Sequence, residues 1–307
     1  MTSEEESVID ELPEILSPKV DVIFKALFGN ENNTAILADF LTAILGLNDG
    51  DITENDITIV DSQKNRRHIN DKLIILDVKL KLKKDKVIDI EMQVEPIKGM
   101  GNRIMFYLAE MLTCQLDKGG DYEKLTPVVS VAIVDYLFFK HNADYHNEFR
   151  MMEKNRHFEF SGLMTVHTLE LPKLPPDTDG KLENWLKFLK SEKKEDFMAV
   201  AEKSPIINEA LEKLISVSAK DDMRELYKAR IKAQRDETGR IAYGFDSGYD
   251  KGKTEGILQG MEKGMLQGMR ERANEIARNM IAMEIDADTI AKATGLFIDD
   301  VLRLQSE

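Results

Sequence analysis

Apolar and polar positions alternate in two stretches of the chain between residues 73 and 94. The opposite, polar side carries Asp77 and Lys79 in the first stretch and Asp89, Glu91 and Gln93 in the second. Side chains of a β-strand point alternately to the two faces of a sheet, so this pattern predicts two strands joined as a hairpin. The apolar positions are Ile74, Leu76, Val78, Leu80, Leu82, Ile88, Ile90, Met92 and Val94.

The register of this hairpin decides which polar residues meet. Both apolar sets lie on one face only if the loop has an odd number of residues. A three-residue loop at 84–86 predicts that Asp77 is opposite Gln93 and that Lys79 is opposite Glu91. Asp77 then lies diagonally from Glu91, within reach of a shared ion.

The gathered acids have two interpretations. Asp and Glu are poor strand formers, so their presence in a hairpin needs an explanation. Two carboxylates are hard oxygen ligands for Mg²⁺, which lowers the pKa of a bound water and holds a scissile phosphate. Alternatively, this face of the sheet is solvated, and its charged residues merely pair with one another; these are Asp77, Lys79, Lys81 and Glu91. The pattern alone leaves both interpretations open.

The rest of the chain predicts an α/β domain followed by helices. Ser17-Pro18 is typical of a helix start, with serine as N-cap and proline at the first helical position. Apolar residues at helical spacing predict helices over 19–28, 34–45, 101–118, 182–201, 206–217 and 222–235. Apolar runs predict strands over 57–61, 127–136 and 164–171, and the second run is continuous enough for burial on both faces.

Charge is distributed unevenly along the chain. The net charge of −14 argues against a general nucleic-acid-binding protein, because contacts with phosphate dominate such binding. Residues 64–86 nevertheless contain nine Lys and Arg against three acids, whereas residues 1–63 contain two Lys against fourteen acids. The basic stretch is either a surface for a phosphate backbone or ordinary solvation of an edge strand.

Cysteine and hydropathy patterns indicate the compartment. The single cysteine, Cys114, excludes an intrachain disulfide and fits a reducing cytoplasm. It falls inside a predicted helix, so we expect a buried thiol. The acidic N-terminus lacks the layout of a signal peptide, and no apolar run is long enough to span a bilayer. We therefore expect a cytoplasmic protein without membrane contact or small-molecule cofactor.

The hairpin also resembles a known active site. Asp71-Lys72, Leu76-Asp77-Val78 and Ile90-Glu91-Met92-Gln93 together resemble the signature of the PD-(D/E)XK nuclease family transposases, also called Rpn family recombination-promoting nucleases. The resemblance implies a restriction-endonuclease-like core with a mixed sheet flanked by helices, plus an all-α C-terminal extension. It implies that Asp77 and Glu91 bind Mg²⁺ or another divalent cation. Gln93 would stand where the superfamily usually has lysine, and Lys79 would supply the missing positive charge.

Further segments carry the same resemblance from Asp21 to Leu174. The helix that contains Asp21 and Lys25 is similar to the family's opening motif, and Arg103 matches a polar position of a later helix. The resemblance makes these three residues possible accessory members of the site. Alternatively, Asp21 is a first-turn acid that interacts with the helix dipole, and Arg103 forms a surface ion pair.

Glycine recurs every four residues from Gly244 to Gly268. In a helix these glycines form a slowly winding stripe that lets another backbone come close. Charged residues between them place the helix in water. Packing against a second copy would offset the low helix propensity of glycine; otherwise the segment is a flexible linker.

The C-terminal residues have the spacing of a helix-turn-helix. DNA reading needs basic or amide residues at the start of the recognition helix, but this helix begins with Asp299-Asp300. We therefore expect a helical hairpin that packs on itself. The predicted organisation is an acidic lead-in at 1–16, a nuclease-like domain at 17–175, a helical subdomain at 181–235, the glycine-periodic helix at 240–270 and the hairpin at 271–307.

The function hypothesis is metal-dependent endonucleolytic hydrolysis of DNA phosphodiester bonds by the α/β domain of a homo-oligomer. A rival hypothesis from another class is a non-catalytic oligomeric interaction protein that retains the nuclease fold. A DNA-binding regulator that uses the C-terminal helices is disfavoured by Asp299-Asp300.

Overall fold

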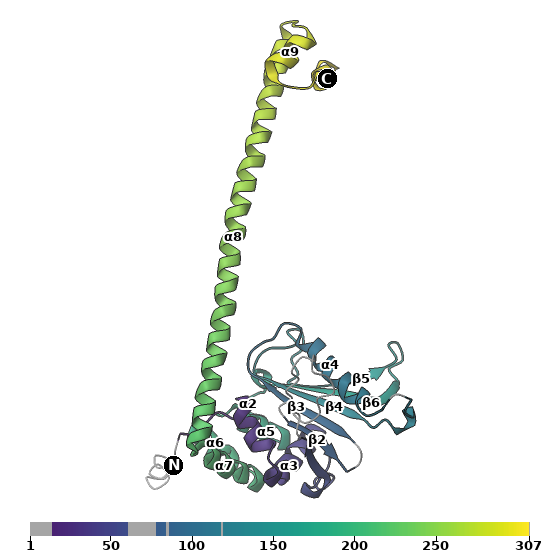
Figure 1. Ribbon diagram of the computed structural model, residues 1–307, viewed down its shortest axis with the longest axis vertical. Helices are drawn as coiled ribbons and strands as arrows, with labels where there is room; N and C mark the ends of the chain where they lie inside the picture. Colours follow the sequence, from purple (N-terminus) through teal and green to yellow (C-terminus); the bar gives the residue numbers. More distant parts are fainter. Residues whose placement is uncertain (1–13, 61–77, 84–85, 118, 307) are drawn as a thin grey trace. The chain divides into compact units, whose positions relative to one another are not determined.

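A mixed sheet of six strands organises the first part of the chain (Figure 1). The strand order is β1-β2-β3-β4-β6-β5; β3, β4 and β6 run parallel, and the remaining neighbours pair antiparallel. The strands are β1 (Ile57–Val60), β2 (Val78–Leu82), β3 (Val87–Gln93), β4 (Val128–Val134), β5 (His146–Met152) and β6 (Glu159–Glu170). The sheet confirms the predicted mixed α/β core.

The structure is a computed structural model that describes residues 14–60, 78–83, 86–117 and 119–306. The chain divides into two units, Met1–Ala233 and Gln234–Glu307, which are described separately. None of the helices within the described ranges is long and apolar enough to cross a membrane.

Helices cover both faces of the sheet. One face packs on α2 (Asp21–Phe28), α3 (Thr34–Ile44), α5 (Lys181–Lys190), α6 (Lys194–Ala201) and α7 (Pro205–Ser218), which share one apolar core with Ile88, Ile90 and Met92 of β3. The other face packs on α4 (Met100–Thr113) through a second core. Parallel β3 and β4 require a crossover connection, and α4 provides it. Short 3-10 helices lie at Glu31–Asn33, Glu54–Asp56, Tyr122–Lys124 and Leu171–Lys173.

The hairpin forms as predicted, but its register differs by two residues. Lys79 is opposite Asp89, and Lys81 is opposite Val87. The N–H of Leu82 donates to the carbonyl of Lys86, so Leu82 is paired with Lys86. A loop at 84–86 would instead pair residue 83 with residue 87. The prediction that Lys79 is opposite Glu91 was therefore wrong. The pattern of alternation fixes the face of each residue but allows either register.

Several predicted helices have different limits. The helix expected over 19–28 begins at Asp21, with Val20 and not Ser17 as its N-cap. The helix expected over 101–118 ends at Thr113, so Cys114 follows it and is exposed, and the expectation of a buried thiol was wrong.

The helix expected over 182–201 is two helices, α5 and α6, because Ser191 adopts an extended conformation after the last turn of α5. The hydroxyl of Ser191 donates to the carbonyl of Lys187 and so caps that turn. The helix expected over 222–235 is the start of α8 (Asp221–Ala282), which continues without a break for 62 residues. Strand β5 was not predicted.

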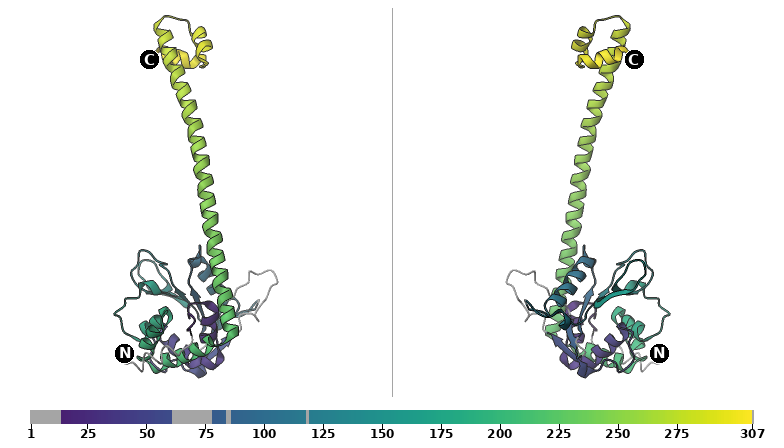
Figure 2. Two further views of the ribbon diagram at one scale, coloured as in Figure 1. Left: turned by 90° about the vertical axis from the view of Figure 1, so that its left-hand side faces the viewer. Right: turned by 90° about the vertical axis from the view of Figure 1, so that its right-hand side faces the viewer.

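The second unit contains most of α8, together with α9 (Ala287–Thr294) and α10 (Ile298–Ser306) (Figure 2). The side chain of Asp286 caps the start of α9, and Gly295 ends this helix with a left-handed φ of 72°. A small apolar core of Ala277, Ile290 and Val301 joins the end of α8 to α9 and α10. The helical C-terminal region agrees with the predicted all-α extension.

Candidate active site

Strand β3 places Glu91 on the face of the sheet that α4 covers. Alternate residues of β3 enter the opposite core, which leaves Asp89 and Glu91 directed toward the α4 side. Asp89 is 1% exposed and Glu91 is 4% exposed. The alternative interpretation of Glu91 as part of a solvated face was therefore wrong. A buried carboxylate is costly unless it is paired, so its partners are informative.

Helix α4 provides the partner of Glu91. The helix begins after Gly99, whose φ of 81° is in the left-handed region that favours glycine. Its buried residues Ile104 and Leu108 pack into the core on this face and hold Arg103 beside the sheet. Nη2 of Arg103 forms an ion pair with Oε1 of Glu91. Nε of Arg103 also donates to the hydroxyl of Tyr107 at 3.2 Å.

Burial controls the protonation chemistry of this cluster. It raises the pKa of Glu91 above its ordinary value, and the charge and hydrogen bond of Arg103 oppose this shift. Burial also raises the pKa of Tyr136, and the negative charge of Glu91 adds to the increase. The Tyr136 hydroxyl is buried without a hydrogen-bond partner among the described residues. The site thus combines a carboxylate, a guanidinium and a neutral phenol.

The other predicted members of the triplet are placed differently. Gln93 lies at the end of β3, where its Nε2 donates to the carbonyl of Glu95 at 3.0 Å. Asp77 lies outside the described residues. Lys79 is opposite Asp89, so the positive charge next to Glu91 comes from Arg103 instead. The interpretation of Arg103 as a member of a surface ion pair was also wrong, since its partner is buried.

The two candidates on α2 have other surroundings. Asp21 forms an ion pair with Arg230 of α8, with Nε donating to Oδ1 at 2.9 Å. Lys25 is exposed to solvent. The apolar residues of α2 pack on the face of the sheet opposite α4. The contacts that the structure gives to Asp21 and Lys25 therefore do not include Glu91.

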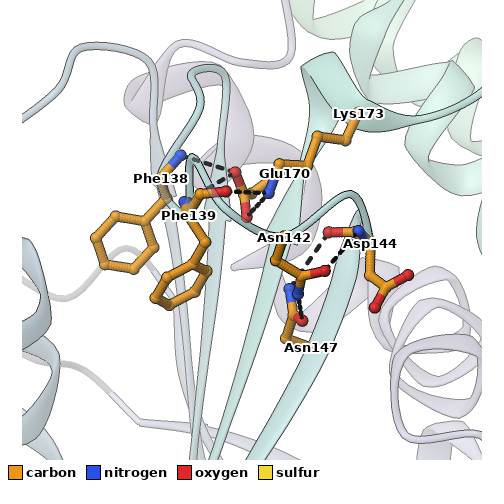
Figure 3. Close-up of polar contacts among 7 residues, drawn as sticks. All are labelled: Phe138, Phe139, Asn142, Asp144, Asn147, Glu170 and Lys173. Atoms are coloured by element: carbon orange, nitrogen blue, oxygen red, sulfur yellow. Dashed lines mark hydrogen bonds and ion pairs between the residues drawn. The ribbon is translucent and has the colours of Figure 1, made fainter.

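A second buried carboxylate, Glu170 at the end of β6, has a different set of partners (Figure 3). Its Oε2 accepts hydrogen bonds from the backbone N–H groups of Phe138 at 2.7 Å and Phe139 at 3.3 Å. Its Oε1 pairs with Nζ of Lys173 at 2.7 Å, and the same Nζ donates to the carbonyl of Phe139. Glu170 therefore fastens the loop after β4 to β6. Sequence reasoning missed this role, although an acid at the end of an apolar strand was a signal.

Two histidines lie next to each other on neighbouring strands. Nε2 of His146 on β5 is 3.0 Å from Nδ1 of His167 on β6. Burial and the neighbouring His146 lower the pKa of His167 to about 4, while burial lowers the pKa of His146. In the part of the chain that the structure describes, no group of three His, Cys, Asp or Glu residues is arranged to hold a metal. The pair is a partly buried hydrogen-bonded contact.

The donor chemistry around Glu91 fits a hard divalent cation. Its carboxylate is buried, and among the described residues Arg103 alone pairs with it. A cation that enters this place would meet an oxygen ligand whose charge already requires compensation. A second carboxylate is needed for a complete site, and the residue predicted for that position is Asp77.

Comparison with protein families gives one match over most of the chain. The model of the PD-(D/E)XK nuclease family transposases matches residues 18–244, which include the sheet, α4 and the start of the glycine-periodic segment. Comparisons with curated proteins and with solved structures give no significant match.

Proposed function

The chain belongs to the PD-(D/E)XK nuclease family transposases, and on this basis we propose that it is a metal-dependent endonuclease that hydrolyses phosphodiester bonds of DNA. The observation that supports this function most directly is the carboxylate of Glu91, which is buried on the interior strand β3 and balanced by the guanidinium of Arg103. Family membership makes DNA the expected substrate.

In this proposal Asp77 and Glu91 hold Mg²⁺ or another divalent cation. Such an ion, when bound, lowers the pKa of a water and stabilises negative charge on phosphate. Gln93 orients the attacking water or the phosphate through its amide. This amide lies at the end of β3, two residues after Glu91, and its Nε2 donates to the backbone carbonyl of Glu95.

Arg103 replaces Lys79 as the source of positive charge in the proposal. Without a metal, its guanidinium compensates Glu91. With a divalent cation held by Asp77 and Glu91, the guanidinium of Arg103 would be available for a phosphate, to which arginine donates two parallel hydrogen bonds. The neutral hydroxyl of Tyr136 supplies a further donor near the same carboxylate.

Cleavage of supercoiled plasmid tests this function. The full chain with millimolar Mg²⁺ is expected to nick the plasmid, whereas Asp77→Ala and Glu91→Gln are expected to lose the activity. Glu95→Gln is the matched control, because Glu95 is an exposed acid four residues after Glu91. Equal nicking by wild type and both site variants, or no nicking by the wild type with any divalent ion, would refute the proposal.

One observation favours a second candidate function, a non-catalytic oligomeric interaction protein that retains the nuclease fold. The ion pair with Arg103 already satisfies Glu91 without any metal. Isothermal calorimetry separates the two candidates, since the second predicts no Mg²⁺ binding at millimolar concentration. Homo-oligomerisation through residues 240–270 is part of both candidates.

A further inference from the structure

The glycines of α8 have no structural explanation within a single chain. An added Cβ would meet no atom of the described residues within 4 Å at any of Gly244, Gly248, Gly252, Gly256, Gly260, Gly264 and Gly268. All seven φ values are helical, so the backbone conformation does not require glycine either. Glycine is the least favourable residue in a helix interior after proline. Seven such residues at a fixed spacing indicate that another surface approaches this side of the helix.

A row of large apolar side chains runs beside the glycine row. An apolar residue follows six of the seven glycines, and Lys253 follows the seventh. These apolar side chains are 54–73% exposed. They are Phe245, Tyr249, Ile257, Met261, Met265 and Met269. The helix therefore carries a row of holes and a row of knobs with the same four-residue spacing.

The spacing determines how a partner helix must lie. Four residues turn an α-helix by about 400°, so the two rows advance by about 40° per repeat and complete one turn in roughly 54 Å. A hydrophobic period longer than 3.6 residues requires a right-handed supercoil. Helices that join through small residues cross at about −40°. With this pitch, that angle brings the axes to about 6 Å, closer than the usual 8–10 Å, which glycine permits.

We infer that the partner is a second copy of this helix, in parallel orientation and in register over residues 244–269. A partner must repeat its knobs every four residues with the same drift, and an identical helix matches both requirements. The charges also permit self-association. The segment contains three Lys against four Asp and Glu, so it is nearly neutral in a chain whose net charge is −14.

Parallel orientation places each glycine against a large side chain. In a parallel pair with a two-fold axis along its length, opposite flanks of the two helices meet, so the glycine row of one copy contacts the apolar row of its partner. In an antiparallel pair, the same flank of each helix meets, so the apolar row of one copy would contact the apolar row of its partner. Close approach along the whole segment is therefore possible only in the parallel pair.

The contact area is sufficient for a stable dimer. A buried Leu-sized or Phe-sized side chain removes about 60–120 Å² from water. The six apolar side chains of each copy then bury roughly 700–1,400 Å² in total, a range that includes the area of about 1,000 Å² expected of a specific interface.

Sedimentation equilibrium of the full chain tests the self-association. We expect a dimer at micromolar concentration. The triple variant Gly252→Ala, Gly256→Ala, Gly260→Ala should raise the dissociation constant at least ten-fold, although alanine strengthens the helix itself. Gly239→Ala is the matched control, because Gly239 is also helical and unobstructed but lies outside the four-residue series. The proposal would be overturned if the wild type were monomeric at about 50 µM. Equal dissociation constants for the triple variant and the control would also overturn it.

Single cysteines test the orientation. Cys114 is the one native cysteine, and Cys114→Ser removes it. In that background, chains with Phe245→Cys mixed with chains with Gly244→Cys should form a mixed intermolecular disulfide on oxidation, since the apolar row of one copy contacts the glycine row of its parallel partner, within reach of the Cα separation of about 4.4–6.8 Å that a disulfide needs. Ser247→Cys places its thiol on the side of the helix away from the proposed contact, so this variant should not form an intermolecular disulfide. Cross-linking of Ser247→Cys as efficiently as the mixed pair, or no mixed disulfide between Phe245→Cys and Gly244→Cys, would reject the parallel pair.

Discussion

Arg103 of α4 forms an ion pair with Glu91 of β3, and the carboxylate that it neutralises is 6% exposed at its side chain while the guanidinium is 30% exposed. The acid is thus inside the protein, and the base is at its boundary with water. Because of this asymmetry the guanidinium can move out into water, whereas the carboxylate remains buried and in need of a cation. The pair therefore supports a site whose cation can be exchanged.

Removal of Arg103 should destabilise the fold. Arg103→Met leaves a buried carboxylate without its partner, which typically costs about 3 kcal/mol. The free energy of unfolding at pH 7, measured by urea denaturation, should fall by about this amount. Arg150→Met is the control, because Arg150 pairs with acids at an exposed site, where a loss below about 1 kcal/mol is expected. Similar losses in the two variants would show that Glu91 does not depend on Arg103.

Magnesium should stabilise Arg103→Met more than it stabilises the wild type. The ion replaces the missing positive charge in the variant, whereas it must displace the guanidinium in the wild type. A ligand at one hundred times its dissociation constant stabilises the native state by about 2.7 kcal/mol. The melting temperature of both proteins with and without millimolar Mg²⁺ measures the difference. If Mg²⁺ raised neither melting temperature, Glu91 would not belong to a metal site.

Loss of Lys173 should also weaken the fold, by a mechanism unrelated to the proposed activity. Lys173→Met removes the cation from Glu170, which is completely buried, and a loss of about 3 kcal/mol is expected. Urea denaturation measures it. The remaining N–H donors of Phe138 and Phe139 keep the carboxylate in place, so divalent-ion binding should stay at the wild-type level. An unchanged free energy of unfolding would contradict the proposed role of Glu170 in holding the loop after β4 against β6.

The histidine contact should make stability depend on pH. The pKa of His167 is lowered to about 4, so below its ordinary value of 6.5 the unfolded chain binds a proton that the folded chain does not. Stability from this group is present above pH 6.5 and is lost as the pH falls toward 4. Between pH 7 and pH 5 the loss is about 2 kcal/mol.

His167→Asn tests this dependence while it keeps a polar atom near the position of Nδ1. The variant should lose less free energy of unfolding between pH 7 and pH 5 than the wild type, as measured by urea denaturation at each pH. A control at His141, which is exposed, should leave the pH dependence unchanged. A wild-type slope retained in His167→Asn would assign the effect to other groups.

Sequence periodicity predicted the elements around the candidate site, but it could not predict the partner of Glu91. Alternation along β3 assigns Glu91 to the side opposite Ile88 and Ile90, and this assignment is correct. It does not reveal whether that side meets water or a helix. The burial of Glu91 depends on α4, whose packing follows from the parallel crossover between β3 and β4.

The register of the hairpin β2–β3 and the role of Glu170 could not be predicted from the sequence, for similar reasons. Registers that differ by two residues give the same alternation of faces, so the hydrophobic pattern cannot distinguish them. Glu170 acts through the backbone N–H groups of Phe138 and Phe139, which are about thirty residues away in the chain and carry no side-chain signal. Contacts between distant segments, unlike periodicity, are not visible in a local window of sequence.

The crossover from β3 through α4 keeps both members of the central ion pair within one short piece of chain, since Arg103 is twelve positions after Glu91. A graft that moves this strand and helix between relatives would carry an acid together with its neutralising base. The protein that received this segment would therefore not contain a buried carboxylate without a partner. Variation elsewhere in the fold can therefore alter the surroundings of the pair without having to preserve the match between its two halves.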